Sequence, residues 1–514
     1  MNRERDIRPR AGKGRRALAL WSPLLFPWLL LVWVACAPQT PDGLPRDREA
    51  GEHRTSPQRT SPQRISPQRI GPGELAALLD PVFAQGMAEE HIPGAAFVLV
   101  QDGRVVMAKG YGVADVESRK PVDPRTTIFP IASISKVFTA TAVMQLVERR
   151  HLDLHADVNR YLTSLQVPAT YPRPITIADL LQHTSGLDEL PGRRVETAAE
   201  VVPLGEFLKS RLVRVHAPGE MTSYSSYGMA LAGLLVTDVS GEPFETYLSR
   251  HVWRPLGMDH TWITVPASQS ANLATAYEIE EGKAVGVPYE IYQTPPASAI
   301  VGTVLDMARF MTAHLQKGRY GNARILGEGT AEIMQEQHAT MHPRMPGWAY
   351  GFQVGDTNGR RLLIHGGDIG GFSTLMVLLP DEHVGFYVAH HLESANLRFA
   401  VQQALLDRYF PARRPPEVVR PRREDAERLR RFAGTYRANI FCHSCPDGGA
   451  GAQDFEVEAS GDGTITVWDQ GWAPVGPLYF ASLDGRRHIG FREGEDGRIV
   501  ALTAGSWRVL ERVR

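Results

Sequence analysis

Ser133 and Lys136 are spaced as a nucleophile and a base that share one face of a helix. Residues 136–147 are rich in apolar residues and free of glycine and proline, which predicts a helix largely buried in a core. Pro130 lies just upstream, where such a helix would start. Ser133 would then keep an unpaired backbone N–H near the positive end of the helix dipole, which suits a nucleophile whose attack creates an oxyanion. A desolvated Lys136 is neutral enough to take the serine proton, whereas the ordinary alternative is a helix-capping serine followed by a surface lysine.

The composition bounds the possible functions. The chain has 514 residues, which suggests two or more domains or one large domain with attachments, and its hydrophobic content of 43% is ordinary for a globular protein. A net charge of -1 gives no global attraction to nucleic acid. The three cysteines, Cys36, Cys442 and Cys445, exclude an extensive disulfide framework and a zinc site of four cysteines from one chain.

The first 36 residues have the pattern of an export signal. A basic segment precedes residue 17, residues 17–35 are apolar and uncharged, and small residues precede Cys36. The ending resembles a bacterial lipobox, in which Cys36 is lipidated, although Trp33 stands where leucine is usual. An uncleaved membrane anchor is the alternative. Either way, we expect the body of the protein in the bacterial periplasm or cell envelope, tethered to the membrane through its N-terminus.

Residues 37–73 predict a linker. They are polar and rich in proline, and the motif Ser-Pro-Gln-Arg occurs three times at five-residue intervals from Ser56. A segment with so few apolar residues cannot bury a core, so we expect a semi-extended spacer between membrane and enzyme. Contact of the basic repeat with anionic lipid or cell wall is a second possibility.

Strands near both ends of the next segment, residues 74–410, enclose a helical middle. This order predicts an α/β protein of the α+β type, with helices on both faces of one antiparallel sheet and a helical subdomain. The predicted elements are a helix at 75–87, a hairpin of strands at 95–100 and 105–109, strands at 361–364, 374–379 and 384–389, and a closing helix at 395–409.

Residues 411–430 predict a basic, proline-rich linker, and residues 431–514 a small all-β domain. Short strands with glycine-rich turns indicate a barrel or a sandwich. The start at 434–436 resembles a lipocalin-like accessory domain, which could cover the mouth of the active site. Within it, Cys442 and Cys445 predict a local disulfide or a pair of free thiols. Zinc binding with His443 is an alternative that lacks a second cysteine pair to complete it.

Residues 74–410 resemble the serine β-lactamase-like family, which holds class C β-lactamases, D-Ala-D-Ala carboxypeptidases and related esterases. A single motif match would be weak, but several occur in the family's order. They are His-Ile-Pro-Gly-Ala at 91–95, Phe-Pro-Ile-Ala-Ser-Ile-Ser-Lys at 129–136, Ile-Thr-Ile-Ala-Asp-Leu-Leu-Gln-His-Thr-Ser-Gly-Leu at 175–187, Pro-Gly at 218–219 with Tyr-Ser-Ser-Tyr-Gly at 224–228, Pro-Leu-Gly-Met at 255–258, residues 303–310, and His-Gly-Gly at 365–367.

The resemblance implies a role for each matched residue. Ser133 would form the acyl-enzyme, while Lys136 and Tyr224 would share the proton transfers. The backbone N–H groups of Ser133 and Asp368 would form the oxyanion hole. His365 would orient Tyr224 or bind a substrate carboxylate.

Three further positions would contact substrate. Gly366 and Gly367 would let it approach the strand backbone. Ser226 stands where the family's Tyr-x-Asn motif has the asparagine that binds the amide of β-lactams and peptides, and it offers one hydroxyl in place of that amide. This departure favours an ester or another acyl substrate. A milder departure is Ser298-Ala299, where many relatives have two glycines.

The sequence therefore predicts an exported serine hydrolase that cleaves an ester or amide of a small or peptide-like acyl substrate. The alternatives are a penicillin-binding D-alanyl-D-alanine carboxypeptidase or β-lactamase, and a non-catalytic binding or scaffold protein that keeps the fold. Serine chemistry needs no cofactor, and we expect no metal at the catalytic site. Nothing in the sequence decides the oligomeric state.

Overall fold

The computed structural model describes residues 69–412, 414–446 and 452–513. The predicted anchor at 1–36, with Cys36, and nearly all of the predicted linker at 37–73 lie outside these ranges. Within them, none of the helices has the length and apolar character needed to cross a bilayer.

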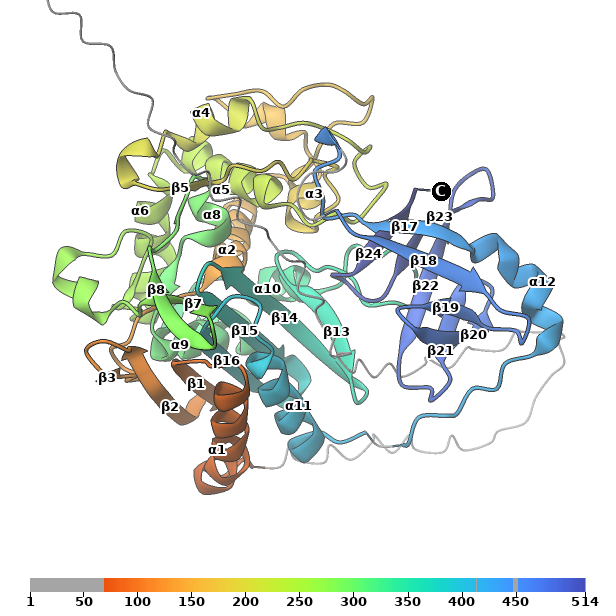
Figure 1. The fold of residues 1–514 in the computed structure, drawn as a ribbon. Helices are drawn as coiled ribbons and strands as arrows, with labels where there is room; N and C mark the ends of the chain where they lie inside the picture. Colours follow the sequence, from red (N-terminus) through yellow and green to blue (C-terminus); the bar gives the residue numbers. More distant parts are fainter. Residues whose placement is uncertain (1–68, 413, 447–451, 514) are drawn as a thin grey trace, which may run out of the picture. The chain divides into compact units, whose positions relative to one another are not determined.

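A seven-stranded antiparallel sheet forms the centre of residues 69–412 (Figure 1). Its strand order is β13-β14-β15-β16-β1-β2-β3, so the hairpin near the start of the described chain pairs with the last strand before the closing helix. This arrangement confirms the predicted fold class. The strands are β1 (Gly94–Gln101), β2 (Arg104–Asp115), β3 (Lys120–Pro121), β13 (Gln353–Thr357), β14 (Arg360–Ile369), β15 (Phe372–Leu379) and β16 (Val384–His391).

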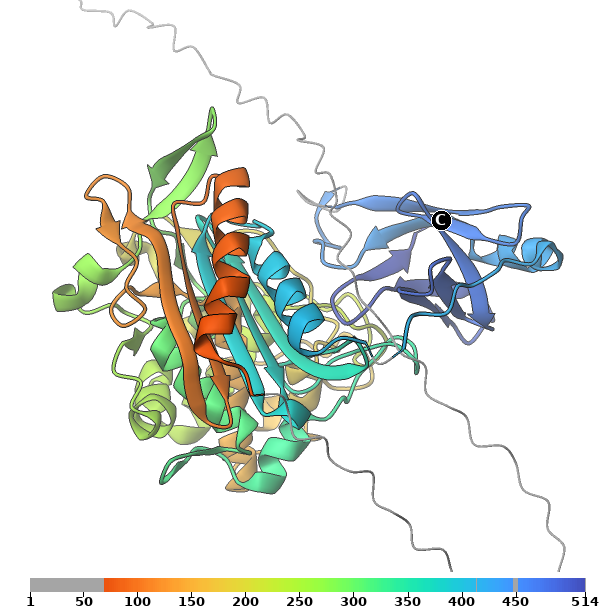
Figure 2. The ribbon, with the colours of Figure 1, turned by 90° about the horizontal axis from the view of Figure 1, so that it is seen from below.

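Helices cover both faces of this sheet. On one face, α1 (Pro72–Glu89) and α11 (Leu397–Tyr409) lie side by side (Figure 2) and bury an apolar core against the strands. On the other, α2 (Ser135–Glu148), α5 (Ser226–Ser240) and α9 (Val304–Leu315) contribute to the larger core. Because both faces are covered, every residue of β1, β15 and β16 is buried, and these strands read as continuous apolar runs rather than alternating ones.

The middle of the chain is less helical than the sequence predicts. It contains short strands, among them the hairpin of β7 (Ala276–Glu280) and β8 (Lys283–Val287) around Gly282, whose φ of 77° favours glycine. The other short elements are the helices α3 (Ile177–Leu181), α4 (Leu204–Lys209), α6 (Phe244–Leu248), α7 (Arg254–Leu256), α8 (Pro295–Ser298) and α10 (Glu328–Gln335), and the strands β4 (Phe129–Pro130), β5 (Arg194–Val195), β6 (Thr261–Trp262), β9 (Ile291–Tyr292), β10 (Val301–Gly302), β11 (Arg319–Tyr320) and β12 (Ala323–Arg324).

The C-terminal all-β domain is a closed eight-stranded barrel. β17 pairs with both β18 and β24, which closes the ring and removes free sheet edges. Helix α12 (Ala426–Leu429) precedes it. The strands are β17 (Gly434–Ala438), β18 (Asp454–Ala459), β19 (Ile465–Val467), β20 (Gln470–Gly476), β21 (Tyr479–Ser482), β22 (His488–Glu493), β23 (Ile499–Thr503) and β24 (Val509–Arg512).

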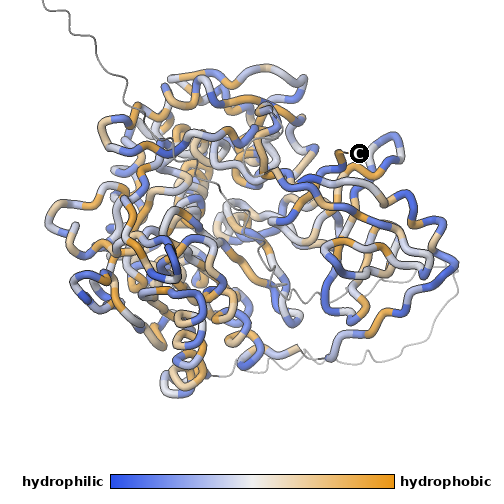
Figure 3. The backbone as a smooth tube through the Cα atoms, in the orientation of Figure 1, coloured by the Kyte–Doolittle hydropathy of each residue, from blue (hydrophilic) through white to orange (hydrophobic). Residues whose placement is uncertain are grey.

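The barrel has an apolar core of its own, with Phe432, Tyr436 and Phe491 among its buried side chains. Hydrophobic residues run along many of the helices and strands of both domains, whereas many outer turns are hydrophilic (Figure 3).

Cys442 and Cys445 form a disulfide in the loop after β17, which is the first of the two options that the sequence left open.

Candidate active site

Ser133 is the only accessible residue in a long buried stretch. All of the remaining residues between 127 and 146 are buried. Ser133 lies in a single 3-10 turn, Ala132–Ile134, and helix α2 begins only at Ser135. The nucleophile candidate therefore precedes the helix instead of lying within its first α-turn, and Ala132 beside it has a φ of 49°, which L residues rarely adopt.

Hydrogen bonds on several sides hold this turn in place. The Ser135 hydroxyl donates to the Ala132 carbonyl at 2.7 Å and accepts from the Ile300 backbone N–H at 3.1 Å. The Thr374 hydroxyl of β15 donates to the Ile131 carbonyl at 3.1 Å. The second serine of the Ser-Ile-Ser sequence is thus a structural residue that fixes the turn presenting the first.

Lys136 is fully buried and reaches back to Ser133. Its Nζ lies 3.2 Å from Ser133 Oγ and donates to the Ala297 carbonyl of α8 at 2.8 Å. Burial, together with the nearby positive charge of Arg193, lowers the pKa of Lys136 well below its ordinary value, while Glu189 opposes this shift weakly. The Lys136 amine therefore contacts the serine hydroxyl and is readily deprotonated, as a base that accepts the serine proton must be.

The ring of Tyr224 lies against the Lys136 amine. The Lys136 Nζ lies 4.7 Å from the centre of the Tyr224 ring. Burial raises the pKa of Tyr224 far above its ordinary value, and the Ser133 hydroxyl opposes that shift, so the phenol stays protonated at neutral pH. Within the described residues, the Tyr224 hydroxyl is buried without a hydrogen-bond partner of good geometry, which leaves it available to a reacting group.

β14 brings the His-Gly-Gly sequence against the nucleophile turn. Pairing with β13 ends at Ile364, so the segment from His365 onward lies at the sheet edge next to the turn. A Cβ on Gly367 would lie 2.7 Å from the Ile131 carbonyl, so only glycine permits this approach. Gly366 points to the opposite face by strand alternation, and a Cβ there would make only ordinary contacts.

His365 is a fully buried, neutral imidazole. Burial and the charge of Lys136 lower its pKa to about 3. Its Nδ1 lies 2.7 Å from the Gly366 carbonyl, which assigns the proton to Nδ1 and leaves Nε2 as an acceptor. The His365 and Tyr224 ring centres are 6.3 Å apart. A neutral imidazole suits the orienting role named for His365 better than attraction of a carboxylate.

The carboxylate of Asp368 is engaged away from the nucleophile. Arg398 of α11 donates to it at 2.8 Å and the Ser373 hydroxyl at 2.7 Å. Although burial opposes its charge, these partners hold the pKa of Asp368 below its ordinary value. The carboxylate of Asp368 is thus fully engaged, so the oxyanion-hole role expected for Asp368 would fall to its backbone N–H.

Ser226 is the first residue of α5 and lies beside a charged pair that sequence reasoning missed. Its backbone N–H donates to Glu189 Oε2 at 2.8 Å, and Glu189 forms an ion pair with Arg193 at 3.4 Å. Both charges act on Lys136. No spacing in the sequence marks them, because they reach the site from an irregular loop after the 175–187 motif.

Aromatic residues from distant parts of the chain complete the surroundings of Tyr224. His183 lies 4.5 Å away between ring centres, and its Nδ1 accepts from the Ser225 backbone N–H at 3.1 Å. Trp507, from the turn before β24 of the barrel, lies 4.3 Å from the Tyr224 ring. Trp348 donates from Nε1 to the Ser506 carbonyl at 2.8 Å, which fixes that turn.

The barrel also binds the segment that leads into Tyr224. Asn439 donates from its amide to the Thr222 carbonyl, and its own carbonyl accepts from the Ser223 hydroxyl at 3.0 Å. Arg492 donates to the Glu220 carbonyl. No sequence motif predicts these contacts or the position of Trp507. A single tryptophan or asparagine in the barrel sequence does not reveal which remote segment it contacts.

Comparison of the sequence with known proteins identifies a family. The model of the Beta-lactamase family matches residues 79–407, well over half of the chain. Protein flp of Staphylococcus aureus strain N315 is 26% identical over 333 residues, which cover 62% of this chain and 63% of that protein. The match thus spans less than two thirds of that relative. Penicillin-binding protein 4 of Amycolatopsis lactamdurans is 28% identical over 324 residues, covering 58% of this chain and 80% of that protein.

Solved structures show the same fold. The octameric penicillin-binding protein homologue from Pyrococcus abyssi superposes with a TM-score of 0.57 at 22% identity, covering 86% of this chain and 100% of that chain. EstCE1, a hydrolase with promiscuous acyltransferase activity, gives a TM-score of 0.55 at 23% identity, covering 65% of this chain and 99% of that chain. At these identities the likeness concerns the fold alone.

Proposed function

The chain belongs to the Beta-lactamase family, whose members are serine hydrolases, and from this premise we propose that it hydrolyses an ester or amide through a Ser133 acyl-enzyme. The observation that carries the proposal is the meeting of Ser133 Oγ with the Nζ of a fully buried Lys136 at 3.2 Å. Tyr224 lies across from both, within the same buried cluster.

In the first step, the Ser133 oxygen attacks the carbonyl carbon of the substrate while its proton passes to the neutral Nζ of Lys136. The backbone N–H groups of Ser133 and Asp368 are proposed to stabilise the oxyanion, and Gly367 supports this because it allows β14 to lie against the nucleophile turn.

In the second step, the bond from the carbonyl carbon to the leaving group breaks and the leaving oxygen or nitrogen receives a proton. Because burial raises its pKa, Tyr224 still carries its proton at neutral pH and can pass it to the leaving atom, and the phenolate so formed is a strong base that recovers a proton from Lys136. Water then attacks the acyl-enzyme, which releases the carboxylic acid and restores Ser133.

We favour an ester-like substrate over a β-lactam or peptide. Ser226 offers a short hydroxyl where an amide-recognising asparagine stands in the family's motif, and its own backbone N–H is engaged by Glu189. Trp507 is 46% exposed while its ring contacts Tyr224, so it can present an apolar surface to the acyl or alcohol portion of the substrate. The penicillin-binding or β-lactamase function is the second candidate, and the likeness to penicillin-binding protein 4 favours it.

The proposal includes export to the bacterial periplasm or cell envelope with a membrane tether through residues 1–36 and, if lipidated, Cys36. The Cys442–Cys445 disulfide supports this, because disulfides persist mainly outside the cytoplasm.

The test is covalent labelling of the chain with a fluorophosphonate and, separately, with a fluorescent penicillin, read by intact mass. An adduct with the phosphonate alone, absent from Ser133→Ala, supports the ester-like hydrolase. Ser210→Ala is the matched control, because Ser210 is an exposed serine at the end of α4 outside the site, and this variant should keep the adduct.

Two other outcomes redirect the proposal. Serine-dependent adducts with both reagents identify the penicillin-recognising alternative and remove the significance given to Ser226. If neither reagent forms an adduct, the enzyme hypothesis is rejected, and the non-catalytic binding or scaffold protein remains.

A further inference from the structure

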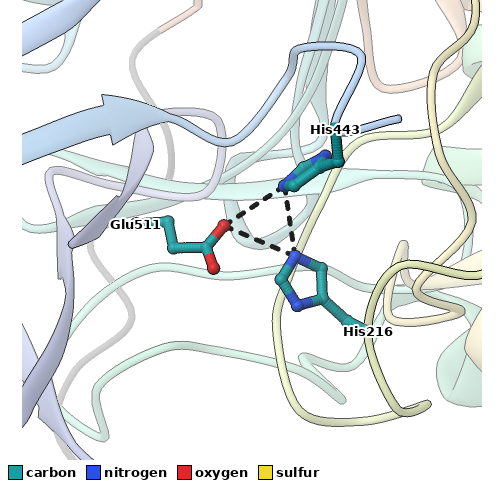
Figure 4. Close-up of side chains that lie close together, drawn as sticks. All are labelled: His216, His443 and Glu511. Carbon is teal, nitrogen blue, oxygen red and sulfur yellow. Dashed lines mark hydrogen bonds and ion pairs between the residues drawn. The ribbon is translucent and has the colours of Figure 1, made fainter. Parts of the chain in front are cut away.

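Three metal-ligating side chains converge at a point where the barrel meets the hydrolase domain. His216 comes from the loop that leads to the Tyr224 segment, His443 from the disulfide loop after β17, and Glu511 from β24 (Figure 4). None of them contributes to the chemistry proposed for Ser133. His216 is buried, whereas the side chains of His443 and Glu511 are 15% and 28% exposed.

The spacing of the three ligand atoms fits a tetrahedral metal site. His216 Nε2 lies 3.2 Å from His443 Nε2 and 3.4 Å from Glu511 Oε2, and His443 Nε2 lies 3.2 Å from the same oxygen. Ligand atoms about 2.0–2.1 Å from a tetrahedral zinc ion are themselves about 3.3 Å apart. The three atoms thus have the spacing of one face of such a tetrahedron.

The second nitrogen of His443 is arranged as in metal-bound histidines. His443 Nδ1 lies 3.2 Å from the Phe441 carbonyl and 3.5 Å from Asp188 Oδ1. A proton on Nδ1 directed at these oxygens leaves the lone pair of Nε2 pointing toward Glu511 and His216. In the metal-free chain a second proton on Nε2 joins His443 to the Glu511 carboxylate, and a zinc ion would take the place of that proton.

Asp188 fixes the loop that carries His443. Its buried carboxylate accepts from the backbone N–H groups of His443 and Ser444, both at 2.9 Å. The Cys442–Cys445 disulfide closes the loop around His443 and withdraws both sulfurs from metal binding. The ligand therefore sits on a loop held by covalent and polar contacts, as a preformed site requires.

We propose that His216, His443 and Glu511 bind a zinc ion that joins the barrel to the hydrolase domain. Two histidines and one carboxylate are a common zinc ligand set, with water in the remaining position. The ion ties the loop at His216 to the barrel eight residues before Tyr224, so it secures the same segment that Asn439 and Trp507 contact. The site is a structural one, separate from the serine chemistry.

The test measures zinc in the full chain by mass spectrometry of the metal after incubation with zinc chloride and dialysis. We expect about one zinc ion per chain, and a rise in melting temperature with zinc chloride. Both effects should be lost in His443→Ala and in the nearly isosteric Glu511→Gln. His251→Ala is the matched control, since His251 contacts Glu242 at 2.9 Å without a second histidine and should leave zinc binding intact.

Replacement of zinc by Co²⁺ identifies the ligands independently of stability. We expect the visible bands of a tetrahedral nitrogen and oxygen site without a thiolate charge-transfer band. A thiolate charge-transfer band would assign the metal to reduced Cys442 and Cys445 and overturn the proposal. A wild-type chain that retains no zinc, or a Glu511→Gln chain that retains it fully, would also overturn it, and the three side chains would then be a metal-free charged cluster.

Discussion

The two sides of the candidate active site are held in different ways. Ser133 and Lys136 lie on one short segment, and their supports, Ile300, Ala297 and Thr374, all belong to the hydrolase domain. Tyr224 is buttressed by His183 from that domain, but the residues just before it are bonded to Asn439 and Arg492 of the barrel, and its ring contacts Trp507. The base side is self-contained, whereas the tyrosine side depends on a second domain.

This difference separates two tasks. A nucleophile and a base three residues apart need only a correctly built turn, and burial supplies the lowered pKa of Lys136. The tyrosine must be placed across from them by segments remote in sequence. Changes on the base side should therefore affect turnover directly, whereas changes at Asn439 or Arg492 of the barrel should act through Tyr224.

The largest effect is expected on the base side. Lys136→Ala removes the group that accepts the Ser133 proton, so turnover of an activated ester should fall by about 10³-fold or more. Initial rates measure this, and circular dichroism controls for folding. A loss below tenfold would break the proton-transfer assignment.

Ser226→Asn sharpens the comparison on the tyrosine side. The new amide offers a donor and an acceptor for a β-lactam amide, so penicillin acylation should rise by about tenfold, while labelling by fluorophosphonate changes little. Stopped-flow labelling with both reagents measures the ratio. An unchanged ratio would mean that residue 226 does not select the substrate.

Asn439→Ala tests whether the barrel acts through Tyr224. It removes the amide that donates to the Thr222 carbonyl, so we expect about a tenfold loss of kcat in the wild-type background and no further loss when added to Tyr224→Phe. Leu483→Ala, which trims a 40% exposed barrel residue, is the matched control and should be silent. Additive losses in the double variant would contradict the coupling.

The smallest effect concerns stability and pH. The lowered pKa of Lys136 means that the folded chain binds fewer protons than the unfolded one, so stability increases with pH from the lowered value up to the ordinary pKa of 10.5. Lys136→Met removes this dependence. We expect the variant to be more stable than wild type at neutral pH, by an amount that shrinks toward pH 10, as measured by denaturant unfolding. A constant difference would contradict the pKa shift.

Local patterns predicted the sheet and its covering helices well. The apolar runs at 374–379 and 384–389 and the turn at Asp102-Gly103 each carry their structure within a few residues. The edge strand β13 and the hairpin of β7 and β8 were not predicted; β7 is exposed along much of its length and lacks a continuous apolar signal.

The candidate site divides along the same line. Ser133, Lys136 and Tyr224 were found because they belong to short motifs, and the structure brings all three together. Glu189, Arg193, Trp348 and Trp507 were missed because their relevance arises from contacts between remote segments. The 3-10 turn that carries Ser133 ahead of α2 was also missed, since this turn depends on the hydroxyl of Ser135.

The long sequence separation between Tyr224 and its barrel contacts has a consequence for synthesis. The bonds to Thr222 and Glu220 span 217 and 272 residues. Domains generally fold in the order in which they leave the ribosome, and contacts of long separation form late. Ser133 and Lys136 can therefore meet before the barrel exists, while Tyr224 waits for it. We therefore expect a refolding chain to gain the hydrolase fold first and its full reactivity afterwards, with a measurable delay between the two.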